Sequence, residues 1–261
     1  MQLNKARILL TGATGGLGRA LAEQLAAGGA ALLLSGRDTE RLARVTTTGA
    51  SEVVRLPARL DDPAELAALV EAARKFRLNA LINNAGIGAF GLFAEQDWAA
   101  IERLLRADLE TPLRLTHALL PWLLAQPAAA VVNIGSTFGS LPFPGFAAYS
   151  TAKAGLRGFS QALRRELADT SVAVLHVAPR AIATPFNSAA VDQLNLELGN
   201  HSDAPSAVAR RIVRAFQRGG GECHPGFPER LFAWLNGVAP GLIDRALAGR
   251  LPIIKRHAAA P

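Results

Sequence analysis

The stretch TGATGGLG, at residues 11–18, decides the fold of this chain. It follows a short apolar run, ARILL at residues 6–10, and leads directly into an alanine-rich segment of helical period. Glycine permits tight turns and close backbone approaches that a Cβ atom would prevent. A glycine loop between a strand and the amino end of a helix can hold a pyrophosphate group. The stretch therefore predicts the first strand–loop–helix unit of a nucleotide-binding sheet.

Apolar runs alternate with alanine-rich segments of helical period along most of the chain. This alternation predicts a parallel sheet with helices on both faces, whose strands can be apolar throughout. We expect an α/β fold with a doubly wound parallel sheet, the Rossmann fold, in a single domain over residues 1–261. The strand runs are ARILLT, AALLLS, EVVRLP, ALINNA, AVVNIG and VAVLHV, and the helices lie near residues 16–28, 38–48, 62–76, 96–125, 148–168 and 205–218.

The carboxyl-terminal third is less regular. Residues 181–203 mix polar and apolar side chains around Pro185, which indicates a mobile flap rather than a scaffold element. Beyond a Gly/Pro-rich turn, residues 222–261 predict a helical extension of one or two helices. We favour packing on the same chain, although a partner subunit or a membrane surface is also compatible with this segment. The cations available for membrane contact are Arg230, Arg245, Arg250, Lys255 and Arg256, while Asp244 opposes it.

The charge balance excludes some functions. The formal charge is +7 with a pI near 10.6, but most arginines stand beside acids in helical segments such as RRELAD, so we expect no nucleic-acid partner. No run of about 18 uncharged apolar residues predicts a membrane span. One cysteine, Cys223, cannot form an intrachain disulfide, which suits the cytoplasm. His224 stands beside Cys223, but two adjacent ligands without partners elsewhere make a poor metal site, so we expect no metal.

Tyr149 is the only tyrosine in the chain, and it stands four residues before Lys153 in the segment YSTAK. On a helix, positions four apart lie on the same face. A nearby ammonium favours the phenolate, so we expect Lys153 to lower the pKa of the phenol from its usual value of about 10. Such a phenol could exchange protons at neutral pH, and the pair therefore predicts an acid/base catalyst.

Two further motifs stand in a fixed order with these. NNAG ends the fourth strand run at residues 83–86, and Ser136 lies thirteen residues before Tyr149. With TGxxxGxG, NNAG, Ser and YxxxK in this order, the chain resembles the single-domain short-chain dehydrogenase/reductase family over residues 6 to about 190. The glycine loop also fits a second spacing, through Gly15 instead of Gly16, which resembles the extended sugar-nucleotide epimerases.

The resemblance implies a role for each matching residue. Tyr149 would exchange a proton with the substrate oxygen, Ser136 would hydrogen-bond that oxygen, and Lys153 would tune the phenol and hold the nicotinamide ribose. Ile182 and Thr184 match the positions that meet the nicotinamide carboxamide. The full set expected to bind the cofactor is Gly12, Thr14, Gly16, Leu17, Gly18, Arg37, Leu60, Asn84, Ala85, Tyr149, Lys153, Ile182 and Thr184.

The end of the second strand run bears on the choice of cofactor. Relatives that use NAD carry an acid there to bind the ribose, whereas this chain reads SGRD, with Gly36 followed by Arg37. A guanidinium suits a phosphate dianion through paired charge-assisted hydrogen bonds. We therefore expect NADP(H) to be favoured over NAD(H), although Asp38 comes next in the sequence.

Three positions depart from the family pattern. Asp108 stands where the family has an asparagine that binds a water molecule of the proton relay, and its charge tends to raise the phenol pKa. Arg59 replaces an aspartate that accepts from adenine, and a guanidinium could stack on adenine instead. Arg180 follows Pro179 where a glycine is usual, and it could face either the substrate or the phosphates.

The sequence as a whole predicts an NADPH-dependent carbonyl reductase or alcohol dehydrogenase, in the cytoplasm and as a homo-oligomer. The substrate is expected to be an apolar ketone or secondary alcohol if the flap residues line the cleft. The alternative is a non-catalytic NADP(H)-binding sensor or scaffold, and a third possibility is an epimerase or dehydratase with the same Tyr/Lys pair. The apolar candidates for the cleft are Val191, Leu194 and Leu198 in the flap, with Phe90 and Phe93.

Overall fold

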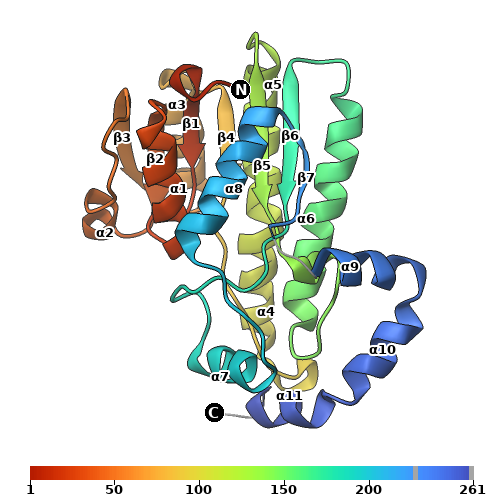
Figure 1. Cartoon of the computed structure of the whole chain (residues 1–261). Coiled ribbons are helices and arrows are strands. Elements are labelled where there is room, and N and C mark those ends of the chain that lie inside the picture. The colour runs from red at the N-terminus through yellow and green to blue at the C-terminus, as the bar shows by residue number, and fades with distance from the viewer. Residues whose placement is uncertain (226–228, 259–261) are drawn as a thin grey trace.

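The computed structural model describes residues 1–225 and 229–258, and it contains one parallel sheet. The strands lie in the order β3-β2-β1-β4-β5-β6-β7, so the predicted doubly wound fold is confirmed (Figure 1). Six strands match the predicted runs, while the short β7 was not predicted because it lies in a segment rich in glycine. The strands are β1 Arg7–Leu10, β2 Ala31–Gly36, β3 Glu52–Pro57, β4 Ala80–Asn83, β5 Ala129–Ile134, β6 Val172–Val177 and β7 Gly221–Cys223.

Helices cover both faces of the sheet, as the apolar strands require. Helices α1 and α8 pack on one face, and α3, α5 and α6 pack on the other. Their bounds, with those of the remaining helices before residue 205, are α1 Gly16–Ala27, α2 Thr39–Ala43, α3 Pro63–Lys75, α4 Trp98–Leu105, α5 Thr111–Leu124, α6 Ala147–Glu166, α7 Ala189–Glu197 and α8 Pro205–Arg218.

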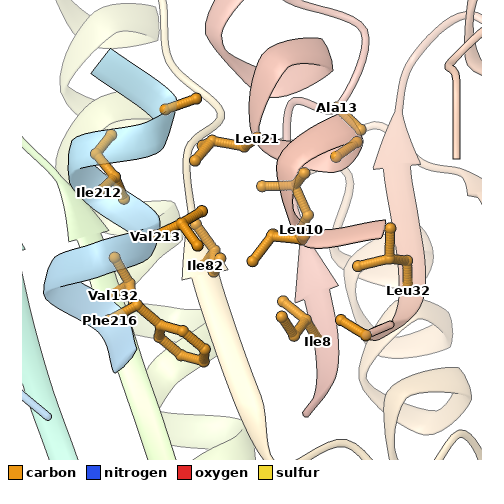
Figure 2. Close-up of a cluster of buried hydrophobic side chains, with 14 of the residues drawn as sticks. Ile8, Leu10, Ala13, Leu21, Leu32, Ile82, Val132, Ile212, Val213 and Phe216 are labelled. Atoms are coloured by element: carbon orange, nitrogen blue, oxygen red, sulfur yellow. The ribbon is translucent and has the colours of Figure 1, made fainter. Parts of the chain in front are cut away.

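The core on the first face joins segments that are far apart in the sequence. Figure 2 shows Ile8 and Leu10 of β1 in one cluster with Leu21 of α1 and with Val213 and Phe216 of α8. All of these side chains are buried. Each stabilises the fold by about 1.5–3 kcal/mol through the apolar surface that it removes from water. The core therefore fixes α1, and with it the glycine loop before it, against the sheet.

The glycine loop is closed so tightly that three of its glycines are needed. Gly12 has φ +64°, and a Cβ atom there would lie 2.7 Å from Cα of Ala85. A Cβ atom on Gly16 would collide with the Thr184 side chain, and one on Gly18 with the carbonyl oxygen of Gly12. At Gly15 a Cβ atom would meet that oxygen at 3.4 Å, an ordinary contact. The structure thus favours the first of the two glycine spacings.

The long helix predicted over residues 96–125 contains an irregular turn. Helix α4 passes through a π-helical turn at Arg106–Glu110 into α5, and Asp108 lies in this turn. Pro112, four residues after Asp108, has no N–H to donate to its carbonyl, and its ring crowds that carbonyl. The wider turn relieves this conflict, and π-helical turns often occur at functional sites.

The predicted flap and extension are more ordered than the sequence indicated. The flap contains α7, whose Val191 and Leu194 are buried. The prediction that residues 181–203 hold no scaffold element was therefore wrong for this helix. The extension forms three helices rather than one or two, namely α9 Glu229–Val238, α10 Pro240–Ala248 and α11 Leu251–Ala258. Helix α11 packs on α7. Residues 226–228 and 259–261 and the side chain of Arg230 lie outside the described part. Within that part, no helix combines the length and the hydropathy needed to cross a membrane.

We predict that Gly18→Ala lowers the free energy of unfolding by about 1–3 kcal/mol, because the added methyl group would meet backbone atoms that cannot yield. Gly15→Ala is the matched control in the same loop and should change it by much less. Urea unfolding of the three proteins measures the difference. Equal stabilities of the two variants would contradict the assignment of the first spacing.

Candidate active site

A cavity of about 1230 Å³ opens beyond the carboxyl ends of the strands. It lies where β1 stands between β2 and β4, so that successive connections leave to opposite sides of the sheet, which is where open α/β sheets bind ligands. The predicted site residues that line it are Gly12, Thr14, Gly16, Leu17, Gly18, Arg37, Leu60, Asn84, Ala85, Ser136, Tyr149, Lys153, Ile182 and Thr184. Of the predicted set, Asp108 does not line the cavity in the described structure.

Helix α6 presents Tyr149 and Lys153 one turn apart, as predicted. The Nζ atom of Lys153 lies 5.6 Å from the centre of the Tyr149 ring and donates to the backbone oxygen of Ile134 at 3.2 Å. The Ser136 hydroxyl oxygen accepts from the backbone N–H of Phe138 at 3.1 Å, and the hydroxyl hydrogen-bonds the Tyr149 phenol. Three groups that can exchange or orient a proton therefore meet at one point of the cavity wall.

Aromatic rings surround the phenol on its other sides. The rings of Phe138, Phe146 and Phe186 have their centres 6.3–6.4 Å from that of Tyr149. Phe90 and Phe143 extend this group through contacts with Phe146. All of these side chains line the cavity. The part of the cavity next to Tyr149 is therefore an apolar pocket.

Burial raises the pKa of Tyr149 above its usual value of about 10. The positive charge of Lys153 and the hydrogen bond with Ser136 lower it, and the negative charge of Asp108 raises it further. The net shift is upward, so the prediction of a lowered phenol pKa was wrong. The predicted effect of Lys153 is present, but loss of water beside the aromatic rings outweighs it.

Asp108 forms a buried ion pair with Lys153. Its Oδ2 atom lies 2.9 Å from the Lys153 Nζ atom, and its Oδ1 atom accepts from the backbone N–H of Ile87 at 2.7 Å. Burial by itself disfavours the ammonium, but Asp108 and Tyr149 together outweigh burial and raise the pKa of Lys153. Asp108 thus reaches Lys153 directly, an arrangement that the predicted water relay did not include.

The glycine loop is tied to the end of β4 by hydrogen bonds. The Thr11 hydroxyl accepts from the backbone N–H groups of Asn84 and Ala85, at 3.0 and 3.1 Å. The Asn84 side chain donates to the backbone oxygens of Thr11 and Gly12. Helix α1 begins at Gly16 without a side-chain cap, so its first N–H groups can bind an anion. This cradle fits the pyrophosphate of a dinucleotide.

Two arginines line the cavity beyond the end of β2. Arg37 was predicted, and Arg41 of α2 was missed, although its position four residues later on a helix was a usable signal. Arg41 also donates to the backbone oxygen of Thr14 at 3.4 Å. Asp38, which raised a doubt about the cofactor, caps α2 by accepting from the backbone N–H of Arg41 at 2.9 Å. Its carboxylate is therefore engaged within the helix.

The other two departures from the family pattern pair with acids. Arg59 lies 3.4 Å from Asp61, and of these two it is Asp61 that lines the cavity beside Leu60. Arg180 donates to both carboxylate oxygens of Asp203, at 2.9 and 2.8 Å. The backbone N–H of Asp203 also donates to the oxygen of Ala181 at 2.9 Å. Arg180 therefore joins the two ends of the flap.

The walls of the pocket come from three parts of the chain. The expected flap residues Val191, Leu194 and Leu198 line it, as does Phe90, whereas Phe93 is exposed and is not among the described lining residues. The sequence analysis missed the phenylalanines at 138, 143 and 146, although their closeness to Tyr149 in the sequence was a signal. It also missed Phe186 and four residues of α9 and α10, which are Phe232, Ile243, Ala246 and Leu247.

The sequence pattern of the short chain dehydrogenase family matches residues 6–195. The chain belongs to the short-chain dehydrogenase/reductase family. The 3-oxoacyl-(acyl-carrier-protein) reductase FabG of Salmonella typhimurium is 31% identical over 212 residues, which cover 77% of this chain and 87% of the relative. This family membership and the cradle beside Tyr149 identify an oxidoreductase that binds a nicotinamide cofactor, NAD or NADP.

Solved structures of this family share the fold. A short-chain dehydrogenase from Sphingobium yanoikuyae in complex with NADPH superposes with a TM-score of 0.78 at 30% identity, covering 92% of this chain and 95% of that one. A short chain dehydrogenase/reductase from Burkholderia phymatum in complex with NAD has a TM-score of 0.84 at 24% identity, covering 93% and 96% of the two chains. The shared fold thus accommodates either cofactor.

We predict that Asp108→Asn lowers the pKa of the Tyr149 phenol, because the negative charge that disfavours phenolate is removed. Since the chain has one tyrosine, the ultraviolet absorbance of tyrosinate during a pH titration reports this group alone. The variant should form phenolate at lower pH than the wild type, and Tyr149→Phe should show no transition. A transition at unchanged or higher pH in Asp108→Asn would show that Asp108 does not act on the phenol.

Proposed function

We propose that the protein is an NADPH-dependent carbonyl reductase or alcohol dehydrogenase of the cytoplasm that acts on apolar ketones and the corresponding secondary alcohols. The observation that carries this proposal is the position of Tyr149, whose phenol meets Ser136 and Lys153 while its ring packs among phenylalanines. FabG, named as a reductase of 3-oxoacyl groups, is a relative with a comparable reaction.

Reduction of a ketone requires a hydride at the carbon and a proton at the oxygen. A bound nicotinamide cofactor would supply the hydride. Tyr149 donates the proton, Ser136 donates a hydrogen bond that orients the substrate oxygen, and Lys153 stabilises the phenolate that remains. A phenol of usual pKa near 10 is already protonated at neutral pH, and burial raises the pKa of Tyr149 further, so Tyr149 is in the form that gives a proton in reduction.

The pocket favours an apolar substrate. Phe138, Phe146 and Phe186 surround the phenol, and Val191 and Leu194 of the flap complete the wall. Binding sites of this kind are mostly apolar with a few placed polar groups, which here include the Ser136 and Tyr149 hydroxyls. Such a wall also keeps water away from the reacting carbonyl. A bulky apolar ketone is the substrate class that these contacts suit.

The two arginines after β2 support the preference for NADPH. Arg37 and Arg41 both line the cavity at the end of β2, where the adenosine ribose binds in this fold. Guanidinium groups bind a phosphate through charge-assisted hydrogen bonds. The Asp38 carboxylate, which would favour the free hydroxyls of NAD, is used to cap α2. Both observations support a phosphate at this position of the cofactor.

We predict that Arg37→Ala weakens NADPH binding by about tenfold to a hundredfold and leaves NADH binding nearly unchanged, because the lost hydrogen bonds are made to a charged phosphate. Titration of the protein with each nucleotide, followed by nicotinamide fluorescence, measures both affinities. Arg44→Ala is the matched control, since Arg44 caps the same helix but is exposed and pairs with Glu40. An equal loss for both nucleotides would refute the phosphate assignment.

We predict that Tyr149→Phe lowers the rate of ketone reduction by about a hundredfold or more, because it removes the proton donor. The assay follows NADPH oxidation with a panel of apolar ketones at saturating cofactor. NADPH binding should stay intact in the variant. Binding without turnover by the wild type would support the alternative of a non-catalytic NADP(H) sensor or scaffold. The proposal includes a homo-oligomer, which light scattering of the wild type tests separately.

A further inference from the structure

Helices α9 and α10 carry apolar side chains that face solvent. On α9, Leu231, Trp234 and Val238 recur at helical spacing, which places them on one face, and they are 50%, 63% and 60% exposed. Leu242, early in α10, is 54% exposed. We call these four residues the apolar row. Figure 1 shows both helices extending away from the sheet beside α6. Exposed apolar side chains gathered on neighbouring helices often mark a surface that meets a partner.

Positive charge accompanies the apolar row. Arg245 is exposed one turn after Leu242 on α10, so the two share a helix face, and it has no ion-pair partner within the described residues. Arg250, which lines the active-site cavity, and Lys255 of α11 are also exposed. From residue 231 onward the sequence has one acid, Asp244, against four arginines and lysines. The fourth cation, Arg256, pairs with Glu197 of α7.

The same helices also reach the active-site cavity. Phe232, next to Leu231 in the sequence, lines the cavity and is still 43% exposed. Ile243 and Leu247 of α10 line it as well, and Ile243 is buried. The apolar wall of the cavity therefore continues, through Phe232, to the exposed face of α9. A surface used for docking on this face would lie beside the cavity.

We propose that α9 and α10 dock this protein on the surface of an anionic phospholipid bilayer, with the apolar row between the acyl chains and headgroups. Interfacial helices combine apolar side chains, often including tryptophan, with arginine and lysine at the headgroups. In a symmetric contact between two copies through this row, the Arg245 side chains beside it would be brought together, which is unfavourable. Anionic lipid instead supplies the complementary charge.

Docking in this way places the cavity at the bilayer surface. An apolar ketone dissolved in the membrane could then pass along Phe232 to Tyr149 without crossing water. This step alone rests on the function proposed above, whereas binding of the protein to vesicles does not. Failure of vesicle binding and failure of ketone reduction are therefore separate outcomes.

The test is sedimentation of the whole protein with vesicles of phosphatidylcholine alone or with about 30% phosphatidylglycerol. We expect binding to the anionic vesicles that weakens as salt rises. Trp234→Ala should weaken binding by about tenfold, because a buried aromatic side chain is lost from the interface. Trp98→Ala is the matched control, since Trp98 is 66% exposed on α4, and it should bind like the wild type.

A second variant tests the charge, since Arg245→Glu changes an exposed side chain and should leave the fold intact. It should weaken binding to anionic vesicles by about tenfold, and it should not increase binding to neutral vesicles. Absence of binding by the wild type, or an equal loss in Trp98→Ala, would overturn the proposal. So would a dimer in solution that Trp234→Ala dissociates, because a second copy would then cover the row.

Discussion

Lys153 and Asp108 are both buried, and there they form an ion pair with 2.9 Å between the Nζ and Oδ2 atoms. Their ion pair joins α6 to the π-helical turn before α5, and the Ile87 N–H joins that turn to the loop after β4. The positions of Lys153 and of Tyr149 one turn earlier therefore depend on this pair. Replacing a buried partner leaves an unpaired charge, so the arrangement is far less tolerant of change than an exposed ion pair.

The ion pair also changes what the tyrosine can do. A lone ammonium near a phenol would favour the phenolate, but here a carboxylate cancels much of that charge. Rings of Phe138, Phe146 and Phe186 remove water from the same group. The site thus holds the phenol beside a compensated cation, in apolar surroundings, and both features favour its protonated form.

Much of the fold could be read from the sequence because its causes are local. Strands buried on both faces are apolar throughout, and the glycines of the loop mark a turn that other residues could not make. The candidate site followed from motif order, and nearly all of its predicted residues line one cavity. The glycine spacing could not be chosen from the sequence, since it depends on contacts of Gly16 with Thr184, far along the chain.

What the sequence could not reveal depended on contacts between distant segments. The sign of the phenol pKa shift followed from burial, which no spacing reports. Arg180 pairs with Asp203, 23 residues later in the sequence. At that separation the sequence does not distinguish Asp203 from the other acidic residues as the partner. The short β7 forms because it pairs with β6, rather than because its own residues favour a strand.

Because the two ends of the flap contact each other, the residues between them can tolerate changes in sequence. The Arg180–Asp203 ion pair holds the two ends of the flap together, and Ile182 also pairs with Asp203 in an isolated bridge. The end of the flap near β6 and the end near α8 are therefore fixed to each other by these contacts. Changes in the length or composition of the intervening residues then alter the pocket wall at little cost to the sheet. Selection could therefore change which molecules the pocket accepts by altering this one loop, while Ser136, Tyr149 and Lys153 stay in place.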